Sequence, residues 1–194
     1  LRRDFNDLKF SDLNFNISKI LDLIYQNKNF QNPSSQVYKT FKRLLNFKFA
    51  LVFLENKKIK NFLNLNINFP YIELGNINSI HLFGIDELLI FKFYISGKKK
   101  YRKVCDIGAN VGLHSLILSK CGYQVDSYEP DPMHNNIAKK IFKKNKVKVN
   151  LSEMAVSNYS GTADFTRILD NTTGSYISNK KNSYGPVNKL KVKV

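Results

Sequence analysis

A short stretch near the middle of the chain has the residue types and spacing of a ligand-binding turn. Val104–Ile107 is an apolar run with one acidic residue, as expected of a parallel strand buried on both faces. Two glycines frame Gly108–Gly112, where the chain bends tightly without Cβ atoms that would block a ligand. From Leu113 the apolar spacing becomes helical. This order places free backbone N–H groups and the positive end of a helix together, and such an arrangement can bind a carboxylate or phosphate. The alternative is an ordinary turn between a strand and a helix of an α/β fold.

The spacing of the polar residues indicates which ligand suits this turn. A dinucleotide site usually has the pattern G-x-G-x-x-G, whose middle glycine lets the backbone approach a pyrophosphate. Here Asn110 stands in place of that middle glycine. Glu129 ends the next predicted strand about 20 residues later, where a carboxylate can accept both hydroxyl protons of a ribose. An amino-acid carboxylate at the turn and a ribose at Glu129 describe S-adenosyl-L-methionine better than NAD.

Several blocks of the second half of the chain resemble one family. Val104–Gly112, which reads V-C-D-I-G-A-N-V-G, and Tyr128–Asp131 resemble the class I, S-adenosylmethionine-dependent methyltransferases of the FkbM type. Ala155–Asn158 and Asn171–Ser175 resemble later blocks of that family, the second of them its active-site loop. The resemblance extends from about Asp86 to the C-terminus and implies the N-terminal half of a Rossmann-like α/β sheet.

The resemblance also implies which residues bind the cofactor. The glycine turn would hold the methionine portion, Asp106 would meet its amino group, and Glu129 would hold the ribose. The loop after the third strand would lie along the adenine. The implied cofactor-binding residues are Asp106, Gly108, Ala109, Asn110, Gly112, Glu129, Pro130, Met154 and Ala155. We assign no catalytic residue and no metal ligand; His114 is either a general base or a helix residue bonded to a neighbour, and we favour the second.

The implied activity is methyl transfer to a hydroxyl group. FkbM-type enzymes generally methylate hydroxyls of sugars or secondary metabolites, so the expected acceptor is a small-molecule or glycan hydroxyl. The sulfonium of the cofactor is already activated, so the protein mainly supplies proximity and alignment. Three alternatives stay open. One is an RNA methyltransferase, which would share this cofactor site, and another is a nucleotide-binding module or remnant without activity. The third, a nicotinamide oxidoreductase, is disfavoured by Asn110 in place of glycine.

The net charge of +16 raises the question of nucleic-acid binding. The lysines are spread along the chain, however, and richness in Asn, Lys, Ile and Phe is the pattern that an AT-rich genome imposes. Denser groups occur at Lys98–Lys103 and along a predicted helix, Pro132–Lys144, whose apolar residues would face inward. We therefore expect most lysines to be solvated, and we favour the hydroxyl acceptor over a nucleic acid as the partner.

Composition bounds the class and location of the protein. The 194 residues, of which 43% are hydrophobic, suffice for one domain with an appendage. No apolar run reaches the length of a membrane span, and no apolar leader follows Arg2 and Arg3. Two cysteines, Cys105 and Cys121, do not form a disulfide framework. We therefore expect a cytoplasmic protein.

We expect two parts, a mostly helical N-terminal appendage over residues 1–85 and a partial cofactor-binding domain over 86–194. Within the appendage, apolar spacing predicts a helix over Gln36–Leu54 and short strands at Phe62–Ile67 and Tyr71–Leu74. A further helix would begin with Asp86 as its N-cap and lead to the first core strand.

The C-terminal end of the chain predicts an incomplete sheet. Val187–Val194 alternates lysines with apolar residues, which is typical of a peripheral strand, here paired with Gly161–Thr166. A full class I domain continues into a fourth core strand beside the first one, and we expect this strand to be missing. Val104–Ile107 would then lie at an open sheet edge. We expect the chain to self-associate through that edge or to bind its cofactor weakly.

Overall fold

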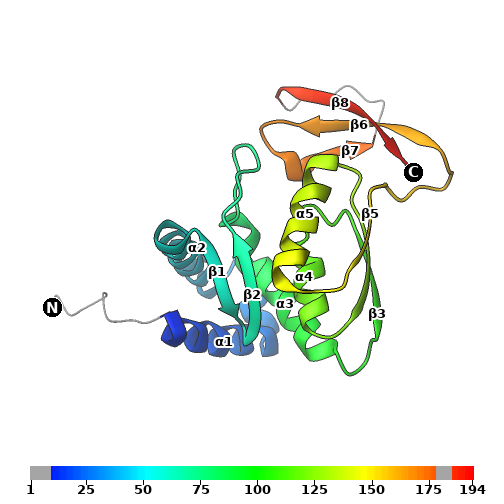
Figure 1. Ribbon diagram of the computed structural model, residues 1–194. Helices are drawn as coiled ribbons and strands as arrows, with labels where there is room; N and C mark the ends of the chain where they lie inside the picture. Colours follow the sequence, from blue (N-terminus) through cyan, green and yellow to red (C-terminus); the bar gives the residue numbers. More distant parts are fainter. Residues whose placement is uncertain (1–9, 178–184) are drawn as a thin grey trace.

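The structure is a computed structural model that describes residues 10–177 and 185–194 (Figure 1). Its centre is a parallel sheet in the order β3-β4-β5, in which a helix joins each strand to the next. This unit is half of a Rossmann-like α/β fold and confirms the predicted fold class. Its elements are β3 (Lys103–Ile107), α4 (Leu113–Lys120), β4 (Gln124–Tyr128), α5 (Pro132–Asn145) and β5 (Asn150–Ser152).

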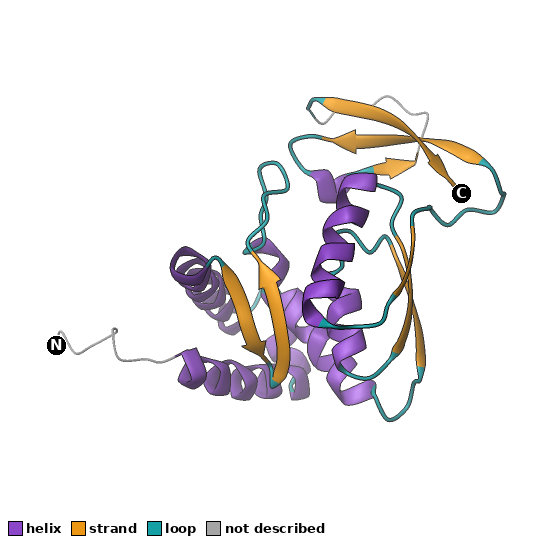
Figure 2. Cartoon of the chain, viewed as in Figure 1, coloured by secondary structure: helices purple, strands orange, loops and turns teal. Residues whose placement is uncertain are grey.

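The helices α4 and α5 cover one face of the parallel sheet, and the other face is open (Figure 2). Val125 and Ser127 of β4 are buried, whereas Cys105 and Ile107 of β3 are exposed, Ile107 by 63%. The prediction that this strand is buried on both faces is therefore wrong. Successive side chains of a strand point to opposite faces, and among the described residues only one face of β3 has helices packed on it.

The strand β3 has a hydrogen-bonded neighbour, β4, on one side only within the described chain. Unpaired N–H and C=O groups of such an edge are a template for pairing with another chain. Self-association through this edge stays a prediction.

The longest helix is α2 (Gln36–Asn56), which confirms the helix predicted there. It begins after Ser35, whose side chain accepts a hydrogen bond from the Tyr38 backbone N–H at 3.1 Å. Neither this helix nor any other in the described part of the chain is long and apolar enough to cross a membrane. The remaining N-terminal elements are α1 (Phe10–Gln26), η2 (Lys28–Gln31), β1 (Lys58–Phe62), β2 (Leu65–Pro70), η3 (His81–Phe83) and α3 (Ile85–Gly97).

The strands β1 and β2 form an antiparallel hairpin whose position differs from the prediction. The predicted strand Phe62–Ile67 contains the hairpin turn, where Leu63 and Asn64 have φ values of +49° and +61°. The other predicted strand, Tyr71–Leu74, has only an isolated bridge between Glu73 and Asn78. The alternation of apolar residues continues across the turn, so it does not reveal where the chain reverses.

The N-cap of α3 lies two residues earlier than predicted. Gly84 occupies its N-cap position without a side-chain hydrogen bond. Asp86 lies inside the first turn and accepts a hydrogen bond from the Tyr38 hydroxyl of α2. The predicted N-cap role of Asp86 is therefore wrong, because a tertiary contact uses its carboxylate instead.

One hydrophobic core joins the N-terminal elements to α4 and α5. Phe83 of η3 lies at the centre of its aromatic part, and its ring centroid lies 5.2 to 6.4 Å from those of five other rings. The five rings belong to Phe49, Phe53, Phe62, Phe69 and Phe91.

The division of the chain into an N-terminal appendage and a cofactor-binding domain, with its boundary between residues 85 and 86, stays a prediction.

A second, antiparallel sheet in the order β7-β6-β8 lies beyond the carboxyl ends of the parallel strands (Figure 1). Its longest ladder runs from Thr162 opposite Lys193 to Ile168 opposite Val187. The predicted pairing of the lysine-rich C-terminal strand is thus confirmed. The elements are β6 (Thr162–Ile168), η4 (Thr172–Gly174), β7 (Tyr176–Ile177) and β8 (Val187–Lys193).

The contact between α4 and α5 requires a glycine at the end of the glycine turn. Gly112 has a φ of +82°, and a Cβ built on it would lie 2.7 Å from Cζ of Phe142 and 3.0 Å from Cβ of Ala138. Both the backbone conformation and the closeness of α5 therefore exclude a side chain at this position.

We expect Gly112→Ala to lower the free energy of unfolding by about 2–4 kcal/mol, because left-handed strain and overpacking add. Gly122→Ala is the matched control, since Gly122 has a φ of +95° but no heavy atom within 4 Å of the added Cβ. It should cost about 1–2 kcal/mol through strain alone. Urea denaturation of both variants measures the difference, and equal losses would contradict the packing role of Gly112.

Candidate functional site

The glycine turn folds against the carboxyl end of β4. The backbone N–H groups of Gly108 and Ala109 both donate to the Tyr128 carbonyl, at 2.9 and 3.0 Å. Gly108 and Asn110 have φ values of +79° and +52°, in the left-handed region that glycine and asparagine tolerate best. The turn thereby brings Asn110 to Glu129.

Glu129 is a buried carboxylate, 4% exposed, at the point where the turn meets α5. Its Oε2 accepts the Asn110 backbone N–H at 2.7 Å, and its Oε1 accepts the Asp131 backbone N–H at 2.8 Å. Burial raises the pKa of Glu129, and these two hydrogen bonds oppose the rise. Each oxygen has a second lone pair, so the carboxylate can accept further hydrogen bonds.

The N–H groups of the glycine turn are not free. Those of residues 108–112 all donate within the protein, to the Tyr128 carbonyl, Glu129, the Asn110 side chain and the Ala109 carbonyl. The prediction that the turn amides are free is therefore wrong, whereas anion binding at the helix start stays a prediction. The N–H groups of Gly108, Ala109 and Asn110 attach the turn to the end of β4 and to Glu129, and those of Val111 and Gly112 donate within the turn.

A cavity of about 100 Å³ opens beside Glu129. The predicted residues Gly108, Asn110, Glu129 and Pro130 line it from the parallel-sheet unit. A Cβ on Gly108 would meet no heavy atom within 4 Å, so the space beside this glycine is open. The other lining residues come from α5 and the antiparallel sheet: His134, Phe165, Thr172, Thr173 and Ser175.

The predicted residue Asp106 lies near this cavity without lining it. Its carboxylate accepts a hydrogen bond from the Ser115 hydroxyl of α4, and Ser115 is in turn 2.6 Å from the Ser127 hydroxyl. These contacts link β3, α4 and β4 directly beneath the glycine turn.

Four further predicted residues also lie outside the cavity lining. Ala109 is buried, and Gly112 packs against α5. Met154 and Ala155 follow β5, and the Ala155 N–H donates to the Lys193 carbonyl of β8 at 2.9 Å. The binding roles of all nine predicted residues stay predictions.

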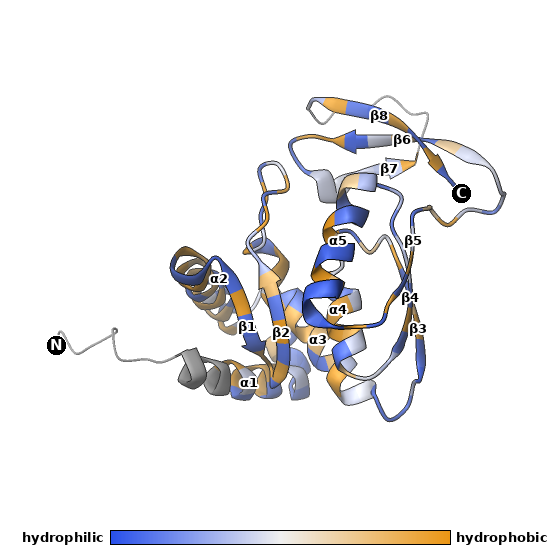
Figure 3. Cartoon of the chain, viewed as in Figure 1, coloured by the Kyte–Doolittle hydropathy of each residue, from blue (hydrophilic) through white to orange (hydrophobic). Residues whose placement is uncertain are grey.

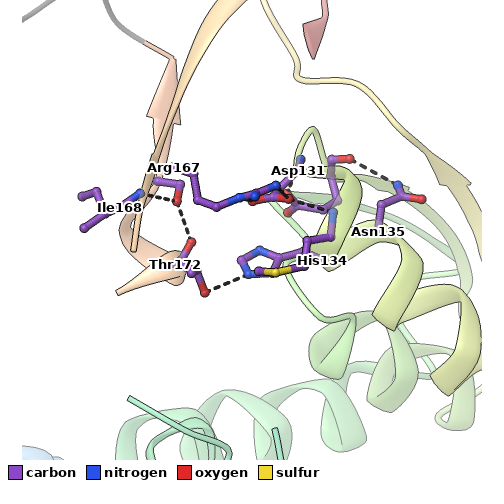
Figure 4. Close-up of polar contacts among 9 residues, drawn as sticks. Asp131, His134, Asn135, Arg167, Ile168 and Thr172 are labelled. Carbon is purple, nitrogen blue, oxygen red and sulfur yellow. Dashed lines mark hydrogen bonds and ion pairs between the residues drawn. The ribbon is translucent and has the colours of Figure 1, made fainter. Parts of the chain in front are cut away.

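Two polar contacts hold the antiparallel sheet over the cavity (Figure 4). Arg167 of β6 donates to both carboxylate oxygens of Asp131, with Nε–Oδ2 at 2.6 Å and Nη2–Oδ1 at 2.5 Å. Nε2 of His134 lies 2.9 Å from Oγ1 of Thr172 in η4. Asp131 also caps α5 by accepting the Met133 N–H at 2.8 Å. One carboxylate therefore fixes both the start of the helix and the position of the sheet.

The protonation states of these residues follow from their surroundings. Burial raises the pKa of Asp131, but the hydrogen bonds from Arg167 and the Met133 N–H more than offset it and hold this pKa below its usual value. Burial lowers the pKa of His134, so its imidazole is neutral at pH 7. A neutral imidazole can accept a hydrogen bond from the Thr172 hydroxyl through Nε2.

The sequence analysis does not identify His134 or Arg167. The sequence does indicate His134, because it is a polar residue at an inward position of an amphipathic helix, three residues after Asp131. No such pattern indicates Arg167, since its partner Asp131 lies 36 residues away in the sequence.

His114 lies outside the cavity lining. Its Nε2 is 2.8 Å from Oε2 of Glu87, and its Nδ1 is 3.0 Å from the Tyr94 hydroxyl. Both partners belong to α3. The Phe91 ring packs edge-to-face against the imidazole, with 5.2 Å between the two ring centroids. His114 is thus bonded to neighbouring residues, which is the alternative that we favour for it.

Comparison with known proteins finds no matching family model and no matching curated protein. Among solved structures, the chain is similar to a SAM-dependent methyltransferase from Agrobacterium tumefaciens, with 12% identity and a TM-score of 0.34 over 54% of this chain and 41% of that one. It is also similar to the N-terminal domain of human METTL16 in complex with SAH, with 16% identity and a TM-score of 0.33 over 80% and 60%. The chain spans less than two thirds of either protein, and likenesses of this size assign no activity to it.

We expect Arg167→Met to lower the free energy of unfolding by about 3–5 kcal/mol, because it leaves the buried Asp131 carboxylate without its partner. Lys191→Met is the matched control. It breaks the exposed ion pair between Lys191 of β8 and Asp164, which lies on β6 like Arg167. The control should cost at most about 1 kcal/mol. Urea denaturation at pH 7 measures both losses, and a loss below 1 kcal/mol for Arg167→Met would refute the structural role of the pair.

The His134 environment predicts a pH dependence. Because its pKa is lower in the folded chain, the unfolded chain binds more protons, and stability falls as the pH drops below about 6.5. We expect His134→Gln to flatten this slope between about pH 5 and pH 7. Thr172→Ala removes the hydrogen bond but keeps the imidazole, so it should retain the slope. Unfolding curves at several pH values test this, and an unchanged slope in His134→Gln would show that another group titrates.

Proposed function

We propose that this chain binds S-adenosyl-L-methionine between the glycine turn and Glu129, and that it acts as a methyltransferase. One observation carries the proposal: the buried Glu129 carboxylate faces the turn and lines the same cavity as Gly108 and Asn110. A carboxylate at the end of the second parallel strand is the usual partner of ribose hydroxyls in Rossmann-like folds.

The residues of the cavity suit part of such a ligand. Glu129 keeps free lone pairs for two hydroxyl donors, and the space beside Gly108 admits atoms close to the backbone. The cavity of about 100 Å³ is smaller than the 300–1,000 Å³ of pockets that enclose a drug-sized ligand. We therefore assign the ribose to this cavity and the two ends of the ligand to the adjoining surfaces.

The resemblance to FkbM-type enzymes supplies the assignment of those two ends. Asp106 would meet the amino group of the methionine portion, beside the open edge of β3. Met154 and Ala155 would lie along the adenine after β5. Ala109 and Gly112 contribute indirectly, because they shape the turn and its contact with α5.

When bound, this cofactor supplies an activated methyl group. The chain's residues would orient the ligand and exclude water, which is the main contribution that a methyl transfer needs from a protein. We propose a hydroxyl of a sugar or small metabolite as the acceptor. The resemblance to FkbM-type enzymes supports this acceptor. The proposal assigns no residue as the base.

Isothermal titration calorimetry with S-adenosyl-L-methionine tests the binding site. We expect Glu129→Gln to weaken binding about 10- to 100-fold, because hydrogen bonds to a charged acceptor contribute about 1.5–3 kcal/mol. Glu55→Gln, in the exposed last turn of α2, is the matched control and should bind like the parent chain. Far-UV circular dichroism shows whether each variant is folded.

Two outcomes would contradict the proposal. If the folded Glu129→Gln variant bound S-adenosyl-L-methionine as tightly as the parent chain, the Glu129 carboxylate would not bind the ribose. Tighter binding of NAD than of S-adenosyl-L-methionine, compared by ultraviolet crosslinking with labelled cofactors, would replace the methyltransferase with a nicotinamide-dependent enzyme.

A further inference from the structure

The helix α5 and the residues after it carry a group of lysines that the candidate site does not use. Residues 132–150 contain six lysines and no aspartate or glutamate. All six are exposed, and Lys139 is 3.5 Å from Oε2 of Glu153. The other five have no acidic partner within 4 Å among the described residues. We call them the α5 lysine cluster: Lys140, Lys143, Lys144, Lys146 and Lys148.

A second segment extends this charged surface. Asn145, at the end of α5, accepts the Asn68 N–H of β2 at 2.6 Å and donates to the Asn68 carbonyl at 2.9 Å. In the hairpin, Asn68 lies opposite Lys60, whose side chain is exposed. Residues 57–70 contain three lysines and no acidic residue. The hairpin therefore places Lys60 one strand away from the end of α5.

The helix dipole accounts for only part of this charge. The carbonyl end of a helix carries about half a negative charge, and a lysine there contributes about 0.3–1 kcal/mol. Lys143 and Lys144 lie in the last turn of α5, and Lys120 donates to the Asn145 carbonyl at 3.0 Å. Lys140, Lys148 and Lys60 gain nothing from this effect, because they lie outside the last turn.

The hydropathy of α5 indicates the chemistry of a partner (Figure 3). Its apolar residues Ala138, Ile141 and Phe142 are already buried in the core. A helix that inserts among lipids needs a free apolar face, and α5 has none, so only the charge of its lysines would attract a membrane. Lys140, Lys143 and Lys144 lie on the helix, and Lys146 and Lys148 lie on the segment that follows it. Charges spread over such a length suit repeated negative charges better than a single anion.

We propose that the α5 lysine cluster, together with Lys60, binds the phosphate backbone of a nucleic acid without reading its sequence. Lysines that contact phosphates release the counterions condensed on the polymer, and this release drives binding. Asn64 and Asn66 of the hairpin are exposed and supply hydrogen-bond donors for phosphate oxygens. The inference is independent of the proposed methyl transfer, because it requires no cofactor.

Fluorescence anisotropy with a fluorescein-labelled single-stranded RNA tests the surface, with the whole chain and no cofactor present. We expect Lys140→Gln/Lys144→Gln to weaken binding about 25-fold at 0.1 M salt, because each lost phosphate contact removes about 0.7 from the logarithmic salt slope. The slope itself should fall by about 1.4. Glutamine is a good helix former, so α5 is retained.

The matched control is Lys39→Gln/Lys42→Gln, which removes the same charge from the exposed side of α2. Its RNA affinity should stay within a factor of about two of that of the unaltered chain, and its salt slope should stay the same. Equal losses in both double variants would show that net charge, and not this surface, attracts the RNA, and would overturn the proposal. So would the absence of RNA binding at low salt, or lysine-dependent binding to phosphatidylserine vesicles that exceeds binding to RNA.

Discussion

The candidate site depends on one buried carboxylate that joins a loop to a helix. Glu129 accepts an N–H from the glycine turn and another from the residue that caps α5. A buried acceptor or donor that loses its partner costs about 1–3 kcal/mol, so the turn and the helix start hold each other in place. The cavity lies between them, and its walls are therefore set by the same two hydrogen bonds.

Two acidic residues separated only by Pro130 differ in their surroundings, because only one of them has a cation beside it. Asp131 pairs with Arg167, which keeps its carboxylate charged and fixes the antiparallel sheet over the cavity. Glu129 has backbone donors alone, and burial raises its pKa. A carboxylate with this limited compensation has the most to gain from hydroxyl donors of a ligand, whereas Asp131 is already satisfied. The proposal therefore assigns ligand binding to Glu129, whereas Asp131 holds the antiparallel sheet in place.

The parts of the site that the sequence predicts correctly are local. The strand, the glycine turn and α5 follow from spacing over a few residues, and the acid at the end of β4 falls where the pattern places it. The contacts of Asp131 with Arg167 and of His134 with Thr172 join residues 36 and 38 positions apart, and no local pattern reports them. The exposure of one face of β3 was mispredicted for the same reason, since it depends on which distant element packs there. The same holds for the turn amides of Gly108, Ala109 and Asn110, whose acceptors are Tyr128 and Glu129.

The most direct test of this account is a nuclear magnetic resonance titration of the ¹⁵N-labelled chain with S-adenosylhomocysteine. If the ribose binds at Glu129, the backbone amides of Asn110 and Asp131 change chemical shift most and saturate together, because both donate to that carboxylate. Shifts confined to other segments, or no shift at these two amides while the ligand binds, would contradict the account.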